Sequence, residues 1–136
     1  MENNLLDLIN YRKNRAFETL EEIKKLLKEN MIFLAMNRIY YAGFYIVNAL
    51  ALLDGYSTSK HGQLIGYFNK TYIASGKVKP EIGDILNIAF RKRTAVDYHD
   101  FVTVKKEEAN QYYEKIKIFV DTVLGLIEEK LKTREY

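Results

Sequence analysis

Apolar residues recur at helical spacing along almost the whole chain, and this pattern limits the possible folds more than any other feature. No segment alternates apolar and polar residues over a useful length, as a half-buried β-strand would. Proline, which interrupts helices, occurs only once, at position 80. The spacing therefore predicts an all-α fold, a bundle of four to five helices.

The limits of the expected helices follow from turn and cap residues. The chain is expected to turn near Asn30, and Gly55 is expected to end a long helix. That helix is apolar almost all round, which is typical of the central helix of a bundle. Ser57 or Ser59 is expected to cap the next helix, and Thr103 the last one. The expected helices end near residue 28 and then span about 32–54, about 60–74, Pro80 through residues 91–93, and about 104–132.

Length and composition limit the class of protein. A chain of 136 residues is typical of one domain, so residues 1–136 are expected to form a single domain with its own core. It contains no cysteine, which leaves no disulfide, thiolate nucleophile or Cys-ligated zinc. The N-terminus lacks the pattern of a signal peptide, and the most apolar stretch, 39–53, is shorter than the roughly 20 residues of a membrane span. We expect a cytoplasmic protein that does not use a membrane.

Positive charge is concentrated in one part of the chain. The formal net charge is only +3, but residues 60–93 hold seven basic residues against two acidic ones, a net +5. Such a local positive field could dock a phosphate backbone. A solvated helix face explains the same charges equally well.

The sequence offers few metal or cofactor motifs. Histidine occurs only at positions 61 and 99, without the paired spacing that a metal site uses. Phosphate-binding glycine loops and a nucleophile elbow are also missing. We therefore expect no metal and no cofactor.

The segment 91–101 is the best candidate for chemistry, because it gathers cations, carboxylates, a phenol and an imidazole at a helix end. An Arg and a His beside one phosphate could cleave RNA without metal, the imidazole moving a proton and the guanidinium stabilising charge. Arg93 and Asp97 also stand four residues apart, so they could simply form an ion pair on a helix.

Two further positions have both a structural and a functional interpretation. Arg38 and Tyr41 share a face of the central helix, and a buried Arg needs a carboxylate or carbonyl partner, so we interpret Arg38 as structural or interface-forming. His61 could bond a neighbouring carbonyl or ring, or it could line a nucleotide pocket.

Three short motifs then resemble a known family. They are Asn37-Arg38-Ile39-Tyr40-Tyr41-Ala42, Ser59-Lys60-His61-Gly62 and Arg93-Thr94-Ala95-Val96-Asp97-Tyr98 with Phe101 just beyond. In this order and spacing the chain resembles the HEPN family (the higher-eukaryote and prokaryote nucleotide-binding domain), in particular its small stand-alone prokaryotic members.

The resemblance implies an antiparallel bundle that forms a homodimer and is often encoded beside a minimal nucleotidyltransferase as a toxin–antitoxin pair. Active toxins of the family are metal-independent RNases with an R-x(4–6)-H motif at the dimer interface. On this chain the motif implies Arg93 as the phosphate-stabilising cation and His99 as the general acid/base. Nucleic acid would be held by Arg91, Lys92 and Lys60, and the pocket or interface would include Arg38, Tyr41, His61, Asp97 and Tyr98.

The leading hypothesis is thus a toxin-like, metal-independent RNase component that acts as a homodimer. The alternative is a non-catalytic module that binds nucleotide or nucleic acid and partners a minimal nucleotidyltransferase. A third hypothesis is a bundle whose dimer serves assembly alone.

Overall fold

The computed structural model describes residues 3–98 and 103–134, and these residues are almost entirely helical. The all-α prediction is confirmed. The elements are α1 (Asn3–Lys28), α2 (Ile32–Leu53), α3 (His61–Phe68), the π-helical turn η1 (Asn69–Ile73), α4 (Pro80–Tyr98) and α5 (Lys106–Arg134).

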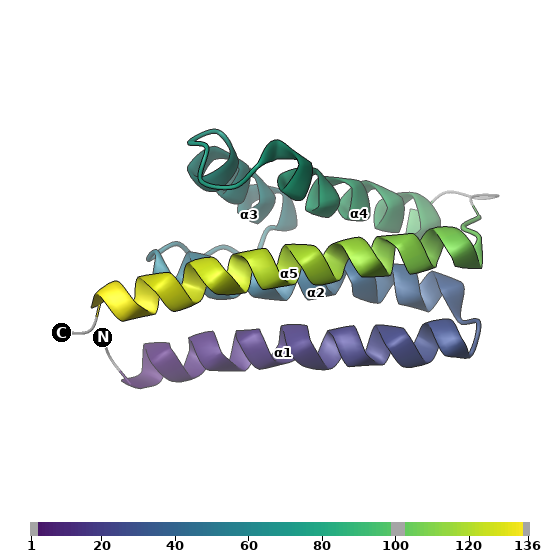
Figure 1. The fold of residues 1–136 in the computed structure, drawn as a ribbon, viewed down its shortest axis with the longest axis horizontal. Coiled ribbons are helices and arrows are strands. Elements are labelled where there is room, and N and C mark those ends of the chain that lie inside the picture. The colour runs from purple at the N-terminus through teal and green to yellow at the C-terminus, as the bar shows by residue number, and fades with distance from the viewer. Residues whose placement is uncertain (1–2, 99–102, 135–136) are drawn as a thin grey trace.

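The helices run up and down in an antiparallel bundle (Figure 1). The three long helices α1, α2 and α5 lie side by side, and α3 and α4 form a second layer above them. Both ends of the described chain lie at the same end of the bundle. At the opposite end, the C-terminal turns of α4 come close to the N-terminal turns of α2, as the contact between Asp97 and Asn37 shows.

Two positive-φ residues set the limits of α2. Asn30, at φ +60°, reverses the chain between α1 and α2, as expected for a residue that tolerates the left-handed region. Gly55, at φ +84°, follows the helix where a side chain would strain the backbone. The predicted span of the central helix is therefore accurate to one residue.

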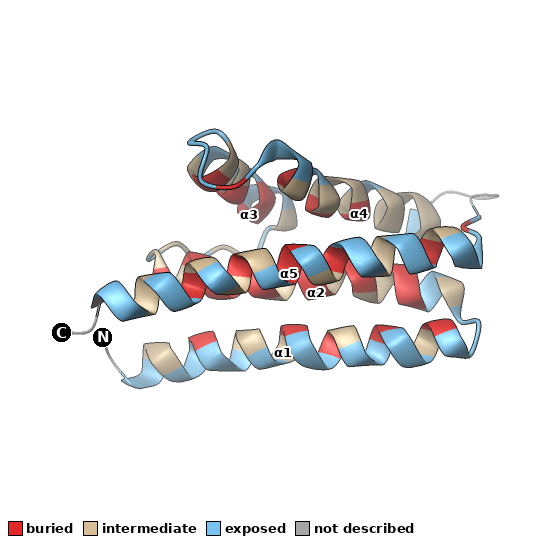
Figure 2. Cartoon of the chain, in the orientation of Figure 1, coloured by how far each residue is buried: buried red, intermediate tan, exposed pale blue. Residues whose placement is uncertain are grey.

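Helix α2 is the centre of the core. Most of its residues are buried, and the buried stripes of the other helices face it (Figure 2). Gly43 permits the closest packing there, because a Cβ atom on it would lie 2.7 Å from Leu86 Cδ1 of α4 and 3.0 Å from Ile116 Cδ1 of α5. This close packing occurs where α2, α4 and α5 meet.

Other helix limits differ from the expectations. Lys60, not Ser57 or Ser59, is the N-cap residue of α3, and no side-chain cap bond forms. Instead, Thr58 Oγ1 accepts a hydrogen bond from the Lys60 amide, 3.2 Å away. The last helix begins at Lys106, so Thr103 does not cap it. Local cap propensity therefore did not locate the start of either helix.

The third predicted helix forms, but its last part is π-helical rather than α-helical. Regular α-helix ends at Phe68, and the chain continues as a π-helical turn over 69–73. Sequence periodicity does not distinguish such a turn from α-helix, because the extra residue shifts the pattern over only one turn.

Among the described residues, no helix combines the length and the apolar character that crossing a bilayer requires.

Candidate functional site

One stripe of α2 is left half-buried by the neighbouring helices. Its residues recur every three or four positions, as one face of a helix does. They are polar or aromatic: Asn37, Arg38, Tyr41, Tyr45 and Asn48. The central helix therefore presents hydrogen-bonding and aromatic groups along its least covered side.

Arg93 of α4 lies against this stripe. Its guanidinium carbon is 5.5 Å from the ring centres of both Tyr40 and Tyr41, and its side chain is only 16% exposed. Arg93 Nε lies 3.1 Å from Asp97 Oδ2, so the predicted ion pair forms. Nε is nevertheless misaligned for a hydrogen bond and finds no acceptor among the described residues. A largely buried guanidinium thus keeps an unused donor.

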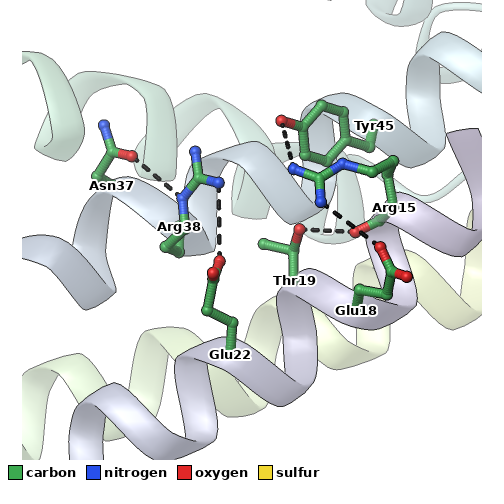
Figure 3. A network of polar contacts seen from close by, with 7 residues as sticks. All are labelled: Arg15, Glu18, Thr19, Glu22, Asn37, Arg38 and Tyr45. Carbon is green, nitrogen blue, oxygen red and sulfur yellow. Dashed lines mark hydrogen bonds and ion pairs between the residues drawn. The ribbon is translucent and has the colours of Figure 1, made fainter.

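Asp97 and Arg38 join α4, α2 and α1 in one chain of polar contacts. Asn37 Nδ2 lies 3.5 Å from Asp97 Oδ2, and its Oδ1 accepts from Arg38 Nε at 3.3 Å. Arg38 also pairs with Glu22 of α1 at 3.7 Å (Figure 3). Its guanidinium lies over the Tyr41 ring at 4.7 Å. Arg38 therefore has the carboxylate partner expected of a buried Arg.

The sequence reasoning missed an arginine of α1 that packs against the same stripe. Arg15 of α1 donates to the Tyr45 hydroxyl at 3.3 Å and stacks over that ring at 5.0 Å, beside Glu18 (Figure 3). The Tyr45 hydrogen bond raises the pKa of Arg15, although burial opposes the shift. Arg12, one turn earlier, also has a buried Nε without an acceptor among the described residues. The partner Tyr45 is 30 positions away, so only the fold reveals the pair.

His61, the first residue of α3, meets the same cluster from another side. Its Nδ1 lies 2.7 Å from the Tyr40 hydroxyl. Its ring stacks on Phe44 with centres 4.2 Å apart and planes 16° apart. Burial, and then the charge of Arg93, lowers the pKa of His61, so the imidazole is neutral at pH 7. The two groups expected from separate motifs, Arg93 and His61, thus lie around one tyrosine.

The remaining candidate residues occupy less enclosed positions. Lys60 and Arg91 are exposed, whereas Lys92 pairs with Glu108 of α5 at 3.7 Å. The Tyr98 side chain is 71% exposed at the end of α4. His99, the candidate acid/base, lies outside the described residues.

The sequence reasoning also missed a second polar cluster, at the other end of α2. The Asp54 carboxylate accepts hydrogen bonds from the Tyr67 and Tyr72 hydroxyls and pairs with Lys130 Nζ at 2.6 Å. Burial alone would raise the pKa of Asp54, but these three hydrogen bonds together lower it. Tyr67 and Tyr72 are five residues apart, about 140° around an α-helix, and the wider π turn between them lets both reach one carboxylate.

Comparison with known proteins identifies the family. The sequence model of the HEPN domain matches residues 9–130, nearly the whole chain. This chain belongs to the HEPN family. The resemblance proposed from the three motifs is therefore confirmed, and the Arg93 cluster is where those motifs meet in the fold.

Individual relatives agree with this assignment. The HEPN chain is 39% identical over 122 residues to a UPF0332 protein of Thermotoga maritima, covering 90% of this chain and 92% of that protein. It is 32% identical over 107 residues to a Methanocaldococcus jannaschii protein named "Putative toxin MJ0142", covering 79% and 73% respectively. A UPF0332 protein of Gloeobacter violaceus is 32% identical over 85 residues, covering 62% and 68%.

Within residues 3–98 and 103–134 of this HEPN domain, no three His, Asp or Glu side chains lie close enough together to hold a metal ion.

Proposed function

We propose that this HEPN protein is a metal-independent endoribonuclease of the toxin type. The observation that carries the proposal is Arg93, a largely buried guanidinium that makes no hydrogen bond to a described residue and lies beside two tyrosines and a histidine. A buried cation that is incompletely paired costs stability, so its retention favours a role in binding an anion. The relative named as a toxin supports the biological class.

The proposed reaction is cleavage within the RNA chain itself. The 2′-oxygen attacks the adjacent phosphorus, the bond to the 5′-oxygen breaks, and the products carry a 2′,3′-cyclic phosphate and a 5′-hydroxyl. Arg93 stabilises the charge that develops on the phosphate oxygens. His99, directly after Tyr98 in the chain, takes the 2′-hydroxyl proton as the general base, and the leaving 5′-oxygen takes a proton from water to become the 5′-hydroxyl.

Cations near this cluster would hold the rest of the substrate. Arg91 and Lys60 are exposed and available to phosphates, and each would add salt-dependent affinity without sequence preference. Lys92 would contribute less, because Glu108 competes for its charge.

We further propose that the protein acts as a homodimer and that a minimal nucleotidyltransferase is its partner. The half-buried stripe of α2 and the exposed Tyr98 ring offer a polar and aromatic surface on which a second copy could pack. Two copies joined there would place their Arg93 clusters at one interface.

The test is cleavage of a mixed RNA in the presence of EDTA. Wild-type protein is compared with the variants Arg93→Ala and His99→Ala, and with Lys130→Met as a control that removes an ion-paired cation at the other cluster. The proposal expects cleavage that survives EDTA, ends in cyclic phosphates, is lost in both variants and is retained in the control. Equal activity in all four proteins, or activity abolished by EDTA, would refute it.

The second candidate function is a non-catalytic module that binds RNA or nucleotide. The observation that favours it is the Asp97 carboxylate, which offsets part of the Arg93 charge that catalysis would use. Arg93-dependent binding of RNA without any cleavage would support this function over the first.

A further inference from the structure

We propose that His61 is a phosphate-contacting residue that works beside Arg93, with Tyr40 holding its ring and fixing which nitrogen carries the proton. The proposal rests on the proposed function, because it adds a residue to the same site. It does not require that the site cleave RNA.

The first argument is that the His61 ring is held in place. Phe44 stacks against it at 4.2 Å, and the Tyr40 ring lies 5.6 Å away at an angle of 26°. Tyr41 meets it edge-on, with centres 5.7 Å apart and planes 86° apart. A ring enclosed by three aromatic side chains loses little freedom when it binds a ligand, which favours a preorganised contact.

The second argument concerns the proton. The Tyr40 side chain is fully buried, and burial raises the pKa of its hydroxyl, which therefore keeps its proton. A buried hydroxyl needs an acceptor, and among the described residues only His61 Nδ1 lies within reach, at 2.7 Å. Tyr40 therefore donates to Nδ1, and the neutral imidazole carries its proton on Nε2. No described residue hydrogen-bonds Nε2.

The third argument is the shared environment of the two donors. Arg93 and His61 both lie against Tyr40, and the Arg93 charge acts on the imidazole. No described residue hydrogen-bonds the Nε2–H group of His61 or the Nη groups of Arg93, whose Nε is buried beside Asp97. A phosphate group accepts hydrogen bonds only and carries negative charge, so it satisfies both donors and relieves the repulsion between Arg93 and a protonating imidazole.

The experiment is imidazole ¹⁵N NMR of the full chain, in which His61 and His99 are the only histidines. A His99→Asn variant assigns the signals. Without ligand, His61 should show the Nε2–H form. A 2′-O-methyl RNA, which has the phosphodiesters but not the attacking hydroxyl, should shift the His61 signals and raise its pKa by about one unit. The same titration with inorganic phosphate shows which groups the site accepts. A shift of the His61 signals by inorganic phosphate indicates a site for any phosphate, and a shift by RNA alone indicates a site for phosphodiesters.

Matched variants separate the role of Tyr40 from general stability. Tyr40→Phe should mix the two neutral forms of His61 and weaken RNA binding by about threefold. Tyr72→Phe removes an equally buried hydroxyl from the other cluster and should change neither property. His61→Gln changes a residue that is less buried than Tyr40, so it provides a second test if Tyr40→Phe folds poorly. This variant should also weaken RNA binding.

The outcomes distinguish this proposal from the proposed function. His61 signals that stay fixed in saturating RNA, or His61→Gln that binds and cleaves like the wild type, would overturn it while Arg93-dependent cleavage still stood. RNA that shifts His61 but is never cut would support the contact and remove the nuclease function.

Discussion

Two polar clusters at opposite ends of α2 contain similar groups but differ in how completely these are paired. At Asp54, one carboxylate receives hydrogen bonds from two tyrosines and an ammonium group. At Arg93, a guanidinium lies against two tyrosines and pairs with Asp97, yet its Nε has no hydrogen-bond acceptor among the described residues. The polar groups of the Asp54 cluster are satisfied internally, whereas those of the Arg93 cluster are not.

The difference shows how structural and functional polar groups can be separated without a bound ligand. A satisfied buried network joins helices and stabilises one arrangement. Asp54 does this by linking the end of α2 to η1 and α5. An incompletely paired buried cation lowers stability, so it needs another reason to be present.

The largest expected effect comes from replacing the cation of each cluster with Met. Arg93→Met should reduce RNA cleavage by about 10²- to 10³-fold, while the free energy of unfolding stays equal or rises, since Asp97 can be solvated. Lys130→Met should leave cleavage unchanged and lower the free energy of unfolding by about 2 kcal/mol, less than for a fully buried pair. Cleavage rates and urea unfolding measure both. Similar losses of cleavage and of stability in the two variants would contradict the distinction between the two clusters.

Neutralising each carboxylate should give the next largest difference. Asp54→Asn should lower the free energy of unfolding by about 3 kcal/mol, because three donors lose a charged acceptor in a site whose side chain is only 11% exposed. Asp97→Asn should cost less than about 1 kcal/mol, since the Asp97 carboxylate is more exposed than that of Asp54. Chemical denaturation measures the two values, and similar losses would show that both clusters are structural.

Removing one hydroxyl from each cluster is a finer test. Tyr72→Phe should lower the free energy of unfolding by about 2 kcal/mol, because its hydroxyl donates to a charged carboxylate. Tyr40→Phe should cost about 1 kcal/mol, because its partner His61 is neutral. Thermal and urea unfolding of the two variants provide the measurement. A larger loss for Tyr40→Phe would reverse the assignment of the structural cluster.

The smallest effect is the pH dependence of stability. The pKa of His61 is lowered by burial and by the Arg93 charge, so the unfolded state protonates first and stability falls as pH drops below about 6.5. The pKa of Asp54 is also lowered, its hydrogen bonds outweighing burial, so its contribution persists until the pH falls below about 4. The free energy of unfolding, measured with urea across pH, should no longer fall below about pH 6.5 in His61→Gln and no longer fall below about pH 4 in Asp54→Asn. An unchanged pH dependence in these variants would mean that other groups cause it.

Much of the fold was predictable because it depends on local patterns. The apolar spacing predicted five helices, and Asn30 and Gly55 marked the ends of α2 within a residue. The Arg93–Asp97 pair followed from four-residue spacing alone. Caps were the weak point, because a cap depends on the path of the preceding loop as well as on the helix.

The candidate site was predicted only in part. The motifs singled out Arg93, Arg38 and His61, but their spacing could not say that Tyr40 lies between Arg93 and His61. Neither Arg15 nor the Asp54 cluster had a sequence signal, since their partners lie 13 to 76 positions away along the chain.

The sequence by itself determined that this protein is helical, that α2 is central and that it resembles the HEPN family, because periodicity and short motifs are properties of neighbouring residues. Only the tertiary structure decided which polar groups are satisfied and which are not. That distinction depends on distances and burial between helices, and it separates the Asp54 cluster, whose hydrogen bonds are satisfied, from the Arg93 cluster, where a guanidinium Nε has no acceptor among the described residues.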